Sequence, residues 1–367
     1  LLGACGLTGA VMGWQEAWSA AAAVGIVVVS AWLWLIPRRG YSVNHNLLES
    51  RVTVGDHALI RLTVTNPRTR PLLPSRMEMP VGPGTAVFAV PTLRSAAVHE
   101  RGFVLPTQRR GIVTVGPVLA VQRDPVGLLQ RERSLTTPQD IHIHPRTLRL
   151  GTVLHGVLRD IEGAVTQDLS SSDVAFHALR DYVPGDDRRN VHWVSTARLG
   201  RLIVRQFEET RRSHHMIILD TAAHSWPSEA FETAISAGAS LALAALGASR
   251  AVSMSTSSGW VSTTSPVRML DALTEVEAKD AVDIEDRVRR CVEERAGVSA
   301  VTIIVNPNVS DEQASRVARL TGADVSTLVI RIRPGASRRR RKLTRGVLLD
   351  CPSLDDLPRL IARGALE

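Results

Sequence analysis

The chain contains 367 residues, of which 44% are hydrophobic and 22% are charged, and its formal net charge is +8. An apolar fraction of this size excludes a disordered chain or a low-complexity fibre, and the length allows two or three domains. Five of the positive charges lie in one run, Arg338, Arg339, Arg340, Arg341 and Lys342. Because the rest of the chain is only mildly basic, we expect no nucleic-acid partner.

Cysteine and lysine usage give two further signals. Lysine occurs only at Lys279 and Lys342, which is typical of a chain encoded by a GC-rich genome. The three cysteines, Cys5, Cys291 and Cys351, are never spaced as a CxxC pair. This spacing predicts reduced, buried thiols in a cytosolic compartment, with neither a disulfide framework nor a zinc site.

A long uncharged run occupies residues 17–36. At about 1.5 Å per residue it spans the ~30 Å hydrocarbon core of a lipid bilayer, and Trp18, Trp32 and Trp34 lie near its ends as interfacial aromatic residues do. Residues 1–15 are also apolar and read as the end of a first membrane helix whose beginning is missing from this sequence. Residues 1–36 are therefore predicted to form a transmembrane hairpin.

The charges beside this run predict an orientation. Arg38 and Arg39 follow the run, whereas Glu16 lies at its other end. The positive-inside rule then places residues 37–367 in the cytoplasm, below the inner membrane. A cleaved signal peptide or a buried core hairpin is the alternative reading of the run.

Residues 37–145 show a period of two that is interrupted by turns. Ala58, Ile60, Leu62 and Val64 alternate with the residues between them, as in a half-buried strand. Short strands with Pro and Gly breaks and no helical period predict a β-sandwich, which we expect to act as a spacer or a binding surface. The predicted strands are residues 58–65, 85–90, 101–105, 112–115 and 141–144.

The pattern changes after residue 212, where buried strands alternate with helices. This alternation predicts that residues 212–367 form an α/β domain with a doubly wound parallel sheet and helices on both faces. Ligands of such sheets bind beyond the carboxyl ends of the strands, where Asp220 and Asn306 stand. The predicted strands are 214–220, 251–255, 300–306, 325–332 and 347–350, and the predicted helices are 228–249, 266–279, 284–295, 311–321 and one from 353.

Residues 146–211 are predicted to connect these two halves, and they are dense in opposite charges. Residues 184–187 read as a turn whose aspartates cap a helix starting near Arg188. The charges, with Tyr182 and Trp193 among them, favour a buried ion-pair cluster that joins the halves, and anion or partner binding by the arginines is the alternative. The charged residues are Arg180, Arg188, Arg189, Arg198, Arg201, Arg205, Asp181, Asp186, Asp187, Glu208 and Glu209.

This segment also carries a long motif. It consists of Arg180, Tyr182, Pro184, Gly185, Asp186, Arg189, Val191 and Trp193, followed by Ala197, Arg198, Val204, Arg205, Phe207 and Glu208. The motif resembles the signature of the domain of unknown function 58 family. The resemblance implies an α/β part similar to von Willebrand factor A domains, and a MoxR-type AAA+ ATPase and a transglutaminase-like membrane protein as partners. No catalytic activity is established for that family.

The same resemblance raises the question of a metal. Von Willebrand factor A domains often hold Mg²⁺ with an Asp-x-Ser-x-Ser loop, a threonine of a second loop and an aspartate of a third. Asp220 matches the first position, but Ala222 and His224 replace the serines, Thr263 or Thr264 would supply the second loop, and Asn306 stands at the third. Alanine offers no oxygen ligand, so we expect a degenerate site and no cofactor, with Mg²⁺ at Asp220 as the alternative.

The chain lacks the motifs that would identify an enzyme. It contains no GxSxG, GxxxxGK[ST] or HExxH motif, so we expect no catalytic residues. A hydrolase or metal-dependent enzyme that uses Asp186, His192 and Asp220 is the alternative. The basic residues 338–342 are predicted to lie in a loop between two strands, either solvated or bound to an anionic membrane surface or an acidic partner.

Together these features predict a membrane-anchored cytoplasmic adaptor. The hairpin would hold it to the membrane, the sandwich would space it, and the α/β domain would present a surface to the ATPase or to a client during the assembly or maturation of envelope or membrane complexes. An extracytoplasmic module that binds the cell wall remains the third alternative.

Overall fold

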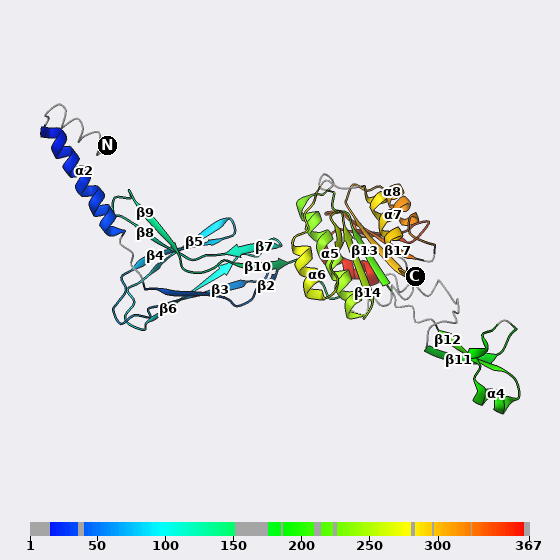
Figure 1. The fold of residues 1–367 in the computed structure, drawn as a ribbon. Coiled ribbons are helices and arrows are strands. Elements are labelled where there is room, and N and C mark those ends of the chain that lie inside the picture. The colour runs from blue at the N-terminus through cyan, green and yellow to red at the C-terminus, as the bar shows by residue number, and fades with distance from the viewer. Residues whose placement is uncertain are drawn as a thin grey trace. The chain divides into compact units, whose positions relative to one another are not determined.

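The computed structural model describes residues 15–35, 40–150, 175–184, 186–208, 214–222, 226–279, 283–295, 297–323 and 325–362. The chain divides into two units, Leu1–His144 and Pro145–Glu367. It is a multi-domain chain of mixed α and β structure, with an apolar helix near its start and several separate sheets (Figure 1).

Helix α2 (Gln15–Trp34) begins the described part of the chain. The predicted apolar run is thus a helix, whereas residues 1–14 and the flanking Arg38 and Arg39 lie outside the described residues. Among the helices that the structure describes, α5 (Ser228–Gly247) alone has the length and composition to cross a bilayer, but most of it is buried inside the α/β domain. The apolar part of α2, Trp18–Trp34, is shorter.

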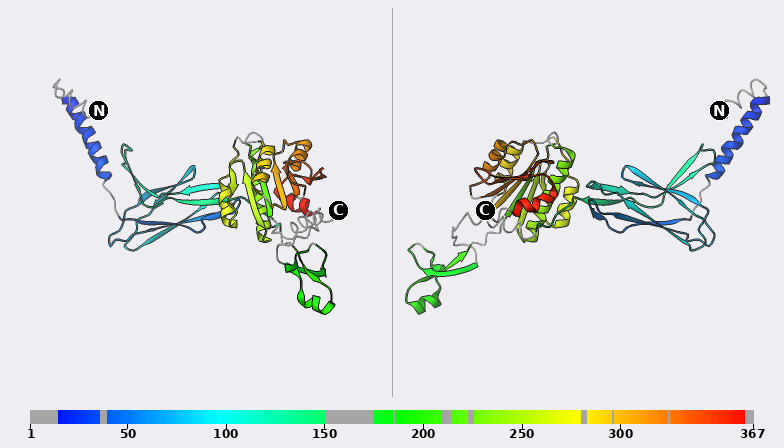
Figure 2. Two further views of the ribbon diagram at one scale, coloured as in Figure 1. Left: turned by 45° about the vertical axis from the view of Figure 1, so that its right-hand side comes forward. Right: turned by 180° about the vertical axis from the view of Figure 1, so that it is seen from behind.

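Two sheets form the β domain of the first unit, one with strand order β1–β3–β6 and the other with order β2–β10–β7–β4–β8–β9, in which β4 also pairs with β5 (Figure 2). Leu62 of the first sheet and Met77, Phe88 and Ile143 of the second belong to one buried apolar core. Two sheets that share a core in this way form a sandwich. The strands are β1 (Ser42–Leu47), β2 (Arg51–Thr53), β3 (Ala58–Thr65), β4 (Ser75–Val81), β5 (Gly84–Val90), β6 (Val98–Leu105), β7 (Gly111–Val115), β8 (Leu119–Arg123), β9 (Gln130–Ser134) and β10 (Gln139–His144).

The five strands predicted in this region are present as β3, β5, β6, β7 and β10, and five others escape the sequence pattern. Strand β9 has the sequence QRERS and is exposed throughout, and β1 buries only His45. These strands are held by backbone pairing to their neighbours, β8 and β3. Hydrophobic alternation does not reveal strands of that kind.

The sheet of the second unit has the order β15–β14–β13–β16–β17–β19–β18. Its five inner strands run parallel, and the two outermost strands are antiparallel to their neighbours. In chain order the parallel strands read 2-1-3-4-5, so the order reverses between β13 and β16. The strands are β13 (His214–Leu219), β14 (Ala251–Thr256), β15 (Gly259–Val261), β16 (Ala300–Val305), β17 (Ser326–Ile332), β18 (Arg339–Lys342) and β19 (Val347–Cys351).

Helices cover both faces of this sheet, as predicted. Helices α5, α6 (Pro266–Thr274) and α9 (Leu357–Ala362) share one apolar core with Ile217 and Leu219 of β13. Helices α7 (Ile284–Glu294) and α8 (Asp311–Arg319) share the opposite core with Met216 and Ile218 (Figure 1). The successive residues of β13 therefore face opposite layers, which is why the strand is apolar on both sides.

The basic residues 339–342 form a strand and not the predicted loop. They make up β18, which pairs antiparallel with β19 at the edge of the sheet. Four consecutive charged residues give no apolar alternation, and all four are exposed. The strand is specified by its backbone pairing and by the buried Leu343 of the following turn.

The connecting segment contains a small hairpin of its own. Strand β11 (Ala175–Asp181) pairs antiparallel with β12 (Ile203–Glu208), and between them lie a 3-10 turn, η1 (Arg188–Asn190), and helix α4 (Trp193–Leu199). Val191, Ile203 and Val204 are its buried apolar residues among those described. Residues 151–174 and 209–213, which lie on either side, and Gly185 are outside the described residues.

Candidate functional site

The signature hairpin is organised by an ion pair between Arg180 and Asp186. The two guanidinium nitrogens of Arg180 donate to the two carboxylate oxygens of Asp186, each at 2.7 Å. Asp186 also accepts the backbone N–H of Val183 at 2.9 Å. The hydrogen bond from Arg180, followed by that from Val183, holds the pKa of Asp186 below its ordinary value. Two of the signature residues thus close the turn that contains Pro184.

Local hydrogen bonds define the helical part of the hairpin. Asp187 caps η1 by accepting the backbone N–H of Arg189 at 2.9 Å, so the helix predicted near Arg188 is a single 3-10 turn. His192 caps α4, since its Nδ1 accepts the backbone N–H of Ser195 and lies 2.8 Å from the Ser195 hydroxyl. Both His192 and Asp186 are therefore occupied by contacts within the hairpin. Within the described residues, no carboxylate contacts His192.

The prediction that the charges of this segment form a buried ion-pair cluster is wrong. The side chains of Arg180, Arg201 and Asp181 are 41%, 63% and 57% exposed, and Arg201 contacts Asp181 at 3.0 Å on the surface. Two strands and a short helix are too thin to remove such charges from water. Arg188, Arg189, Arg198 and Arg205 form no ion pair with any carboxylate that the structure describes.

The hairpin exposes apolar residues beside these arginines. Trp193 of the signature is 66% exposed, and Val183, Val194 and Leu199 are also exposed. The backbone N–H of Tyr182 donates to the carbonyl oxygen of Leu202. Glu208 lies at the end of β12, but its side chain is outside the description. The hairpin is therefore a small unit with an exposed surface of arginine and apolar side chains.

A second candidate site lies where the strand order reverses in the α/β domain. Asp220 follows β13 and Asn306 follows β16, and both are buried, with 6% and 7% of their surfaces exposed. The side-chain nitrogen of Asn306 donates to Asp220 at 2.7 Å, and the backbone N–H of Ala222 donates to the other carboxylate oxygen at 3.1 Å. The sequence thus places these two residues together correctly.

The donors around Asp220 do not fit a Mg²⁺ site. Mg²⁺ requires oxygen ligands, whereas the Asp220 carboxylate accepts N–H groups, including the amide that Asn306 turns toward it. No group of three or more Asp, Glu, His or Cys side chains gathers in the described part of the chain. His224, the other residue of the predicted loop, is outside that part.

The predicted second-loop donors lie at the wrong end of the sheet. Thr263 donates to the carbonyl of Val252, which is register partner of His215 at the start of β13. Strand β15 runs antiparallel to β14 and returns the chain to that end of the sheet. The sequence pattern does not reveal β15, so the position of Thr263 could not be predicted. The hydroxyl of Thr221, the residue after Asp220, hydrogen bonds instead to that of Ser257, which follows β14.

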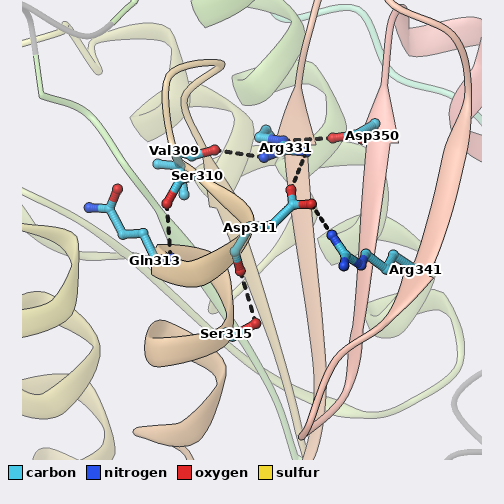
Figure 3. A network of polar contacts seen from close by, with 8 residues as sticks. All are labelled: Val309, Ser310, Asp311, Gln313, Ser315, Arg331, Arg341 and Asp350. Atoms are coloured by element: carbon cyan, nitrogen blue, oxygen red, sulfur yellow. Dashed lines mark hydrogen bonds and ion pairs between the residues drawn. The ribbon is translucent and has the colours of Figure 1, made fainter.

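A buried charge network lies at the ends of β17 and β19 (Figure 3). Arg331, whose side chain is 3% exposed, donates to Asp350 at 2.6 Å, to the Val309 carbonyl at 2.7 Å and pairs with Asp311 at 2.9 Å. Burial opposes the charge of Arg331, but the bonds to Asp350 and Asp311 outweigh it and hold its pKa above the ordinary value. Asp311 also binds Arg341 of β18.

Sequence reasoning missed this network, although a signal was present. Arg331 stands inside the buried strand sequence STLVIRI and Asp350 inside VLLDC. A charge within a buried strand needs an opposite charge, and two such strands therefore predict a pair. The network joins β17, β19, β18 and the start of α8, so it is a structural feature of this corner of the sheet.

Comparison with protein families identifies the signature. The model of the family described as "Protein of unknown function DUF58" matches residues 178–332, from within β11 to the end of β17. Residues 178–332 therefore match that family, as the motif predicts. The curated proteins contain no match to the chain.

Solved structures give only distant likenesses. The CARDB domain of the PF1109 protein from Pyrococcus furiosus, in complex with di-metal ions, is 13% identical, with a TM-score of 0.21 over 28% of this chain and 91% of that chain. A beta-glucosidase from Listeria innocua in complex with glucose is 11% identical, with a TM-score of 0.19 over 26% of this chain and 16% of that chain. Scores this low carry no argument for this chain.

Proposed function

We propose that this chain is a membrane-anchored adaptor that works by protein–protein binding on the cytoplasmic side of the inner membrane. Its partner would be a MoxR-type AAA+ ATPase, with a transglutaminase-like membrane protein as a second partner, in the assembly or maturation of envelope or membrane complexes. Both partners are implied by the resemblance to the domain of unknown function 58 family, whose model matches residues 178–332.

The observation that carries the anchor is the surface of α2. Val27, Val28 and Val29 are exposed in succession, and at 3.6 residues per turn three successive residues point to widely different sides of a helix. Ile26, Trp32 and Leu33 are exposed as well. A helix that is apolar all round belongs either in a protein core or in a bilayer. The tryptophans Trp18 and Trp34 near its ends favour the bilayer.

The binding role is supported by the α/β domain and the hairpin. The strand order with its antiparallel edge strand β15 is compatible with a von Willebrand factor A-like domain, a fold that commonly serves for binding. The hairpin exposes Trp193 and arginines without described ion pairs, and Trp and Arg are enriched in binding hot spots. We therefore expect the hairpin to contact a partner.

Two alternatives from other classes remain open. A hydrolase would need Asp186, His192 and Asp220 to act together, and the structure engages each of them in local hydrogen bonds. A wall-binding module would need the sandwich outside the cell. Labelling of an engineered Ser75→Cys in intact cells with a membrane-impermeant reagent would favour that module, whereas protection favours the cytoplasmic adaptor.

The test of the adaptor is capture of its partner. The full chain is purified in detergent with and without ATP, and co-purifying proteins are identified. A double variant of the hairpin, Arg188→Glu with Arg198→Glu, is expected to lose the ATPase. The matched control is Arg131→Glu with Arg133→Glu on the exposed strand β9, which should retain it. Retrieval of no ATPase by the unaltered chain would contradict the proposal.

A further inference from the structure

Strand β18 ends the sheet of the α/β domain, and its outer edge is open in the described part of the chain. In an antiparallel pair, residues alternate between those that bond to the neighbouring strand and those whose N–H and C=O groups point away. The backbone N–H of Leu343 bonds to Gly346 across the turn. By alternation Arg341 and Arg339 face β19, and Arg340 and Lys342 direct their backbone groups outward.

The side chains of β18 make both faces of this edge positive. Arg341 reaches Asp311 on the face that α7 and α8 cover. Arg340 lies opposite Leu349, whose side chain belongs to the core on the other face. Arg339, Arg340 and Lys342 form no ion pair with a described carboxylate. The nearby Asp311 already pairs with Arg331, and Asp356 lies 3.5 Å from Arg338.

The edge is also held in place before any partner arrives. Leu343 is buried among the residues under α7 and α8. A side chain at Gly346, where φ is +78°, would collide with the backbone of Thr327 in β17. The turn of the β18–β19 hairpin therefore packs tightly against the sheet, and a strand that is already ordered binds at a lower entropic cost.

The four cationic residues of β18, Arg339–Lys342, determine which kind of strand can pair with this edge. A second copy of β18 would bring like charges opposite each other, which is destabilising, and charged edges commonly prevent such self-association. An extended segment with acidic side chains would instead meet the cationic side chains of Arg339, Arg340 and Lys342. We propose that β18 binds an extended acidic segment of a partner protein, which adds to the sheet as an eighth strand.

This inference rests on the adaptor proposal and deepens it by naming the chemistry of the partner. The outward N–H and C=O groups of Arg340 and Lys342 would supply the backbone hydrogen bonds, as in other cases of strand addition. The side chains of Arg339, Arg340 and Lys342 would supply the selectivity for acidic residues. Arg341 is already tied to Asp311 and would keep the strand in position.

The test uses the full chain in nanodiscs of neutral lipid and a synthetic peptide of about 10 residues, a typical upper length for a strand, in which glutamate alternates with valine or threonine. The matched probe is the same peptide with its four central backbone nitrogens methylated. This change keeps the charges but removes N–H donors. We expect the unmodified peptide to bind and methylation to weaken binding by about tenfold or more, since backbone bonds give strand addition its affinity.

Two variants at one position separate the backbone from the charge. Arg340→Pro removes an outward N–H, which edge strands tolerate, and should abolish binding of the peptide while the thermal midpoint is retained. Arg340→Gln keeps the N–H and should weaken binding only a few-fold, as loss of one exposed charge does. Equal binding of both peptides, or full binding by Arg340→Pro, would overturn the proposal.

The remaining outcomes are also decisive. If vesicles with anionic lipid bind the chain through Arg340 and Lys342 while the acidic peptide does not bind, the edge is a membrane contact and the proposal fails. If the unaltered chain captures the ATPase and Arg340→Pro captures it equally, the strand-addition inference fails but the adaptor stands. If the peptide binds but no ATPase is captured, the adaptor proposal fails and the acidic-strand site remains.

Discussion

The side-chain amide of Asn306 donates to the carboxylate of Asp220 at 2.7 Å and so connects the ends of β13 and β16. These are the two strands between which the strand order reverses, the position where sheets of this class bind their ligands. Here the carboxylate is satisfied by N–H groups from Asn306 and Ala222. The site is thus a hydrogen-bonded corner between two strands, and its response to an added charge and to a metal can be measured.

Replacement of Asn306 by aspartate should destabilise the α/β domain. Asn306→Asp removes the donated bond and puts two carboxylates in contact in a buried position, which we expect to cost about 3–5 kcal/mol at pH 7. Repulsion raises the pKa of one carboxyl group, so the cost should fall as the pH is lowered through that raised pKa. Urea unfolding at pH 7 and pH 5 measures both effects.

Asn308→Asp is the control for that substitution, because Asn308 is exposed two residues away. It should change the free energy of unfolding by no more than about 0.5 kcal/mol, as is usual on a surface. An equal loss in both variants would mean that the Asp220–Asn306 contact has no special weight.

From the contacts of Asp220 we expect Mg²⁺ to leave the thermal stability of the unaltered chain unchanged. The thermal midpoint of the unaltered chain should be the same in millimolar Mg²⁺ and in EDTA, since Asp220 accepts N–H groups and Asn306 offers it no oxygen. Asn306→Asp supplies a second carboxylate, so Mg²⁺ should raise the midpoint of that variant. Differential scanning calorimetry compares the four conditions. Stabilisation of the unaltered chain by Mg²⁺ would show that the predicted metal site functions after all.

His215 should make the α/β domain sensitive to mild acid. Its side chain is fully buried next to Thr302, with Nε2 at 2.9 Å from the Thr302 hydroxyl, and burial lowers its pKa to about 3. The unfolded chain binds a proton near pH 6.5, but the folded chain does not. Stability is therefore complete above pH 6.5 and is lost at up to about 1.4 kcal/mol per pH unit as the pH falls toward 3.

The double variant His215→Met with Thr302→Val tests this assignment, because it removes the imidazole without leaving the threonine hydroxyl unpaired. Its free energy of unfolding should fall less steeply between pH 6.5 and pH 4 than that of the unaltered chain. His45 and His214, whose pKa values burial also lowers, remain in both proteins and supply a common background. Identical slopes would show that His215 is not the group that titrates.

The parts of the fold that the sequence can predict are those with a strong apolar pattern. The apolar strands HHMIIL and AVTIIV and the alanine-rich helix α5 are predicted within a few residues, since burial on both faces leaves a strong pattern. The pairing of Asp220 with Asn306 follows from the parallel order of the strands. The strand RRRK and the position of Thr263 do not, because RRRK has no apolar alternation and the strand before Thr263, β15, is only three residues long.

The density of charges along the sequence does not indicate which charges are buried. The many charges of the hairpin suggest burial, yet Arg201 and Asp181 are exposed, because two strands and a short helix are too thin to cover them. A buried ion pair is instead formed by Arg331 and Asp350, each the single charged residue of its strand, which lie opposite each other in the register of β17 and β19. Local composition cannot distinguish these cases, since burial depends on the layers above and below.

Removal of Arg331 should strongly destabilise the corner formed by β17, β19 and α8. Arg331→Met leaves the buried Asp350 without its partner, and we expect a loss of about 3–5 kcal/mol. Arg331→Met with Asp350→Leu removes both charges and should recover much of that loss. Chemical denaturation of the three proteins gives the coupling energy. A double variant less stable than the single one would contradict a simple charge pair.

The anchor can be tested through two residues of α2. Val24→Arg with Val28→Arg places two charges one turn apart in the apolar helix, at a cost of about 2.5–3.5 kcal/mol for each at the centre of a membrane helix. We expect this variant to move from the membrane pellet to the supernatant after an alkaline carbonate wash. Val24→Leu with Val28→Leu is the matched control and should stay in the pellet. If the arginine variant also stays there and resists extraction as the control does, α2 does not hold the chain to the bilayer.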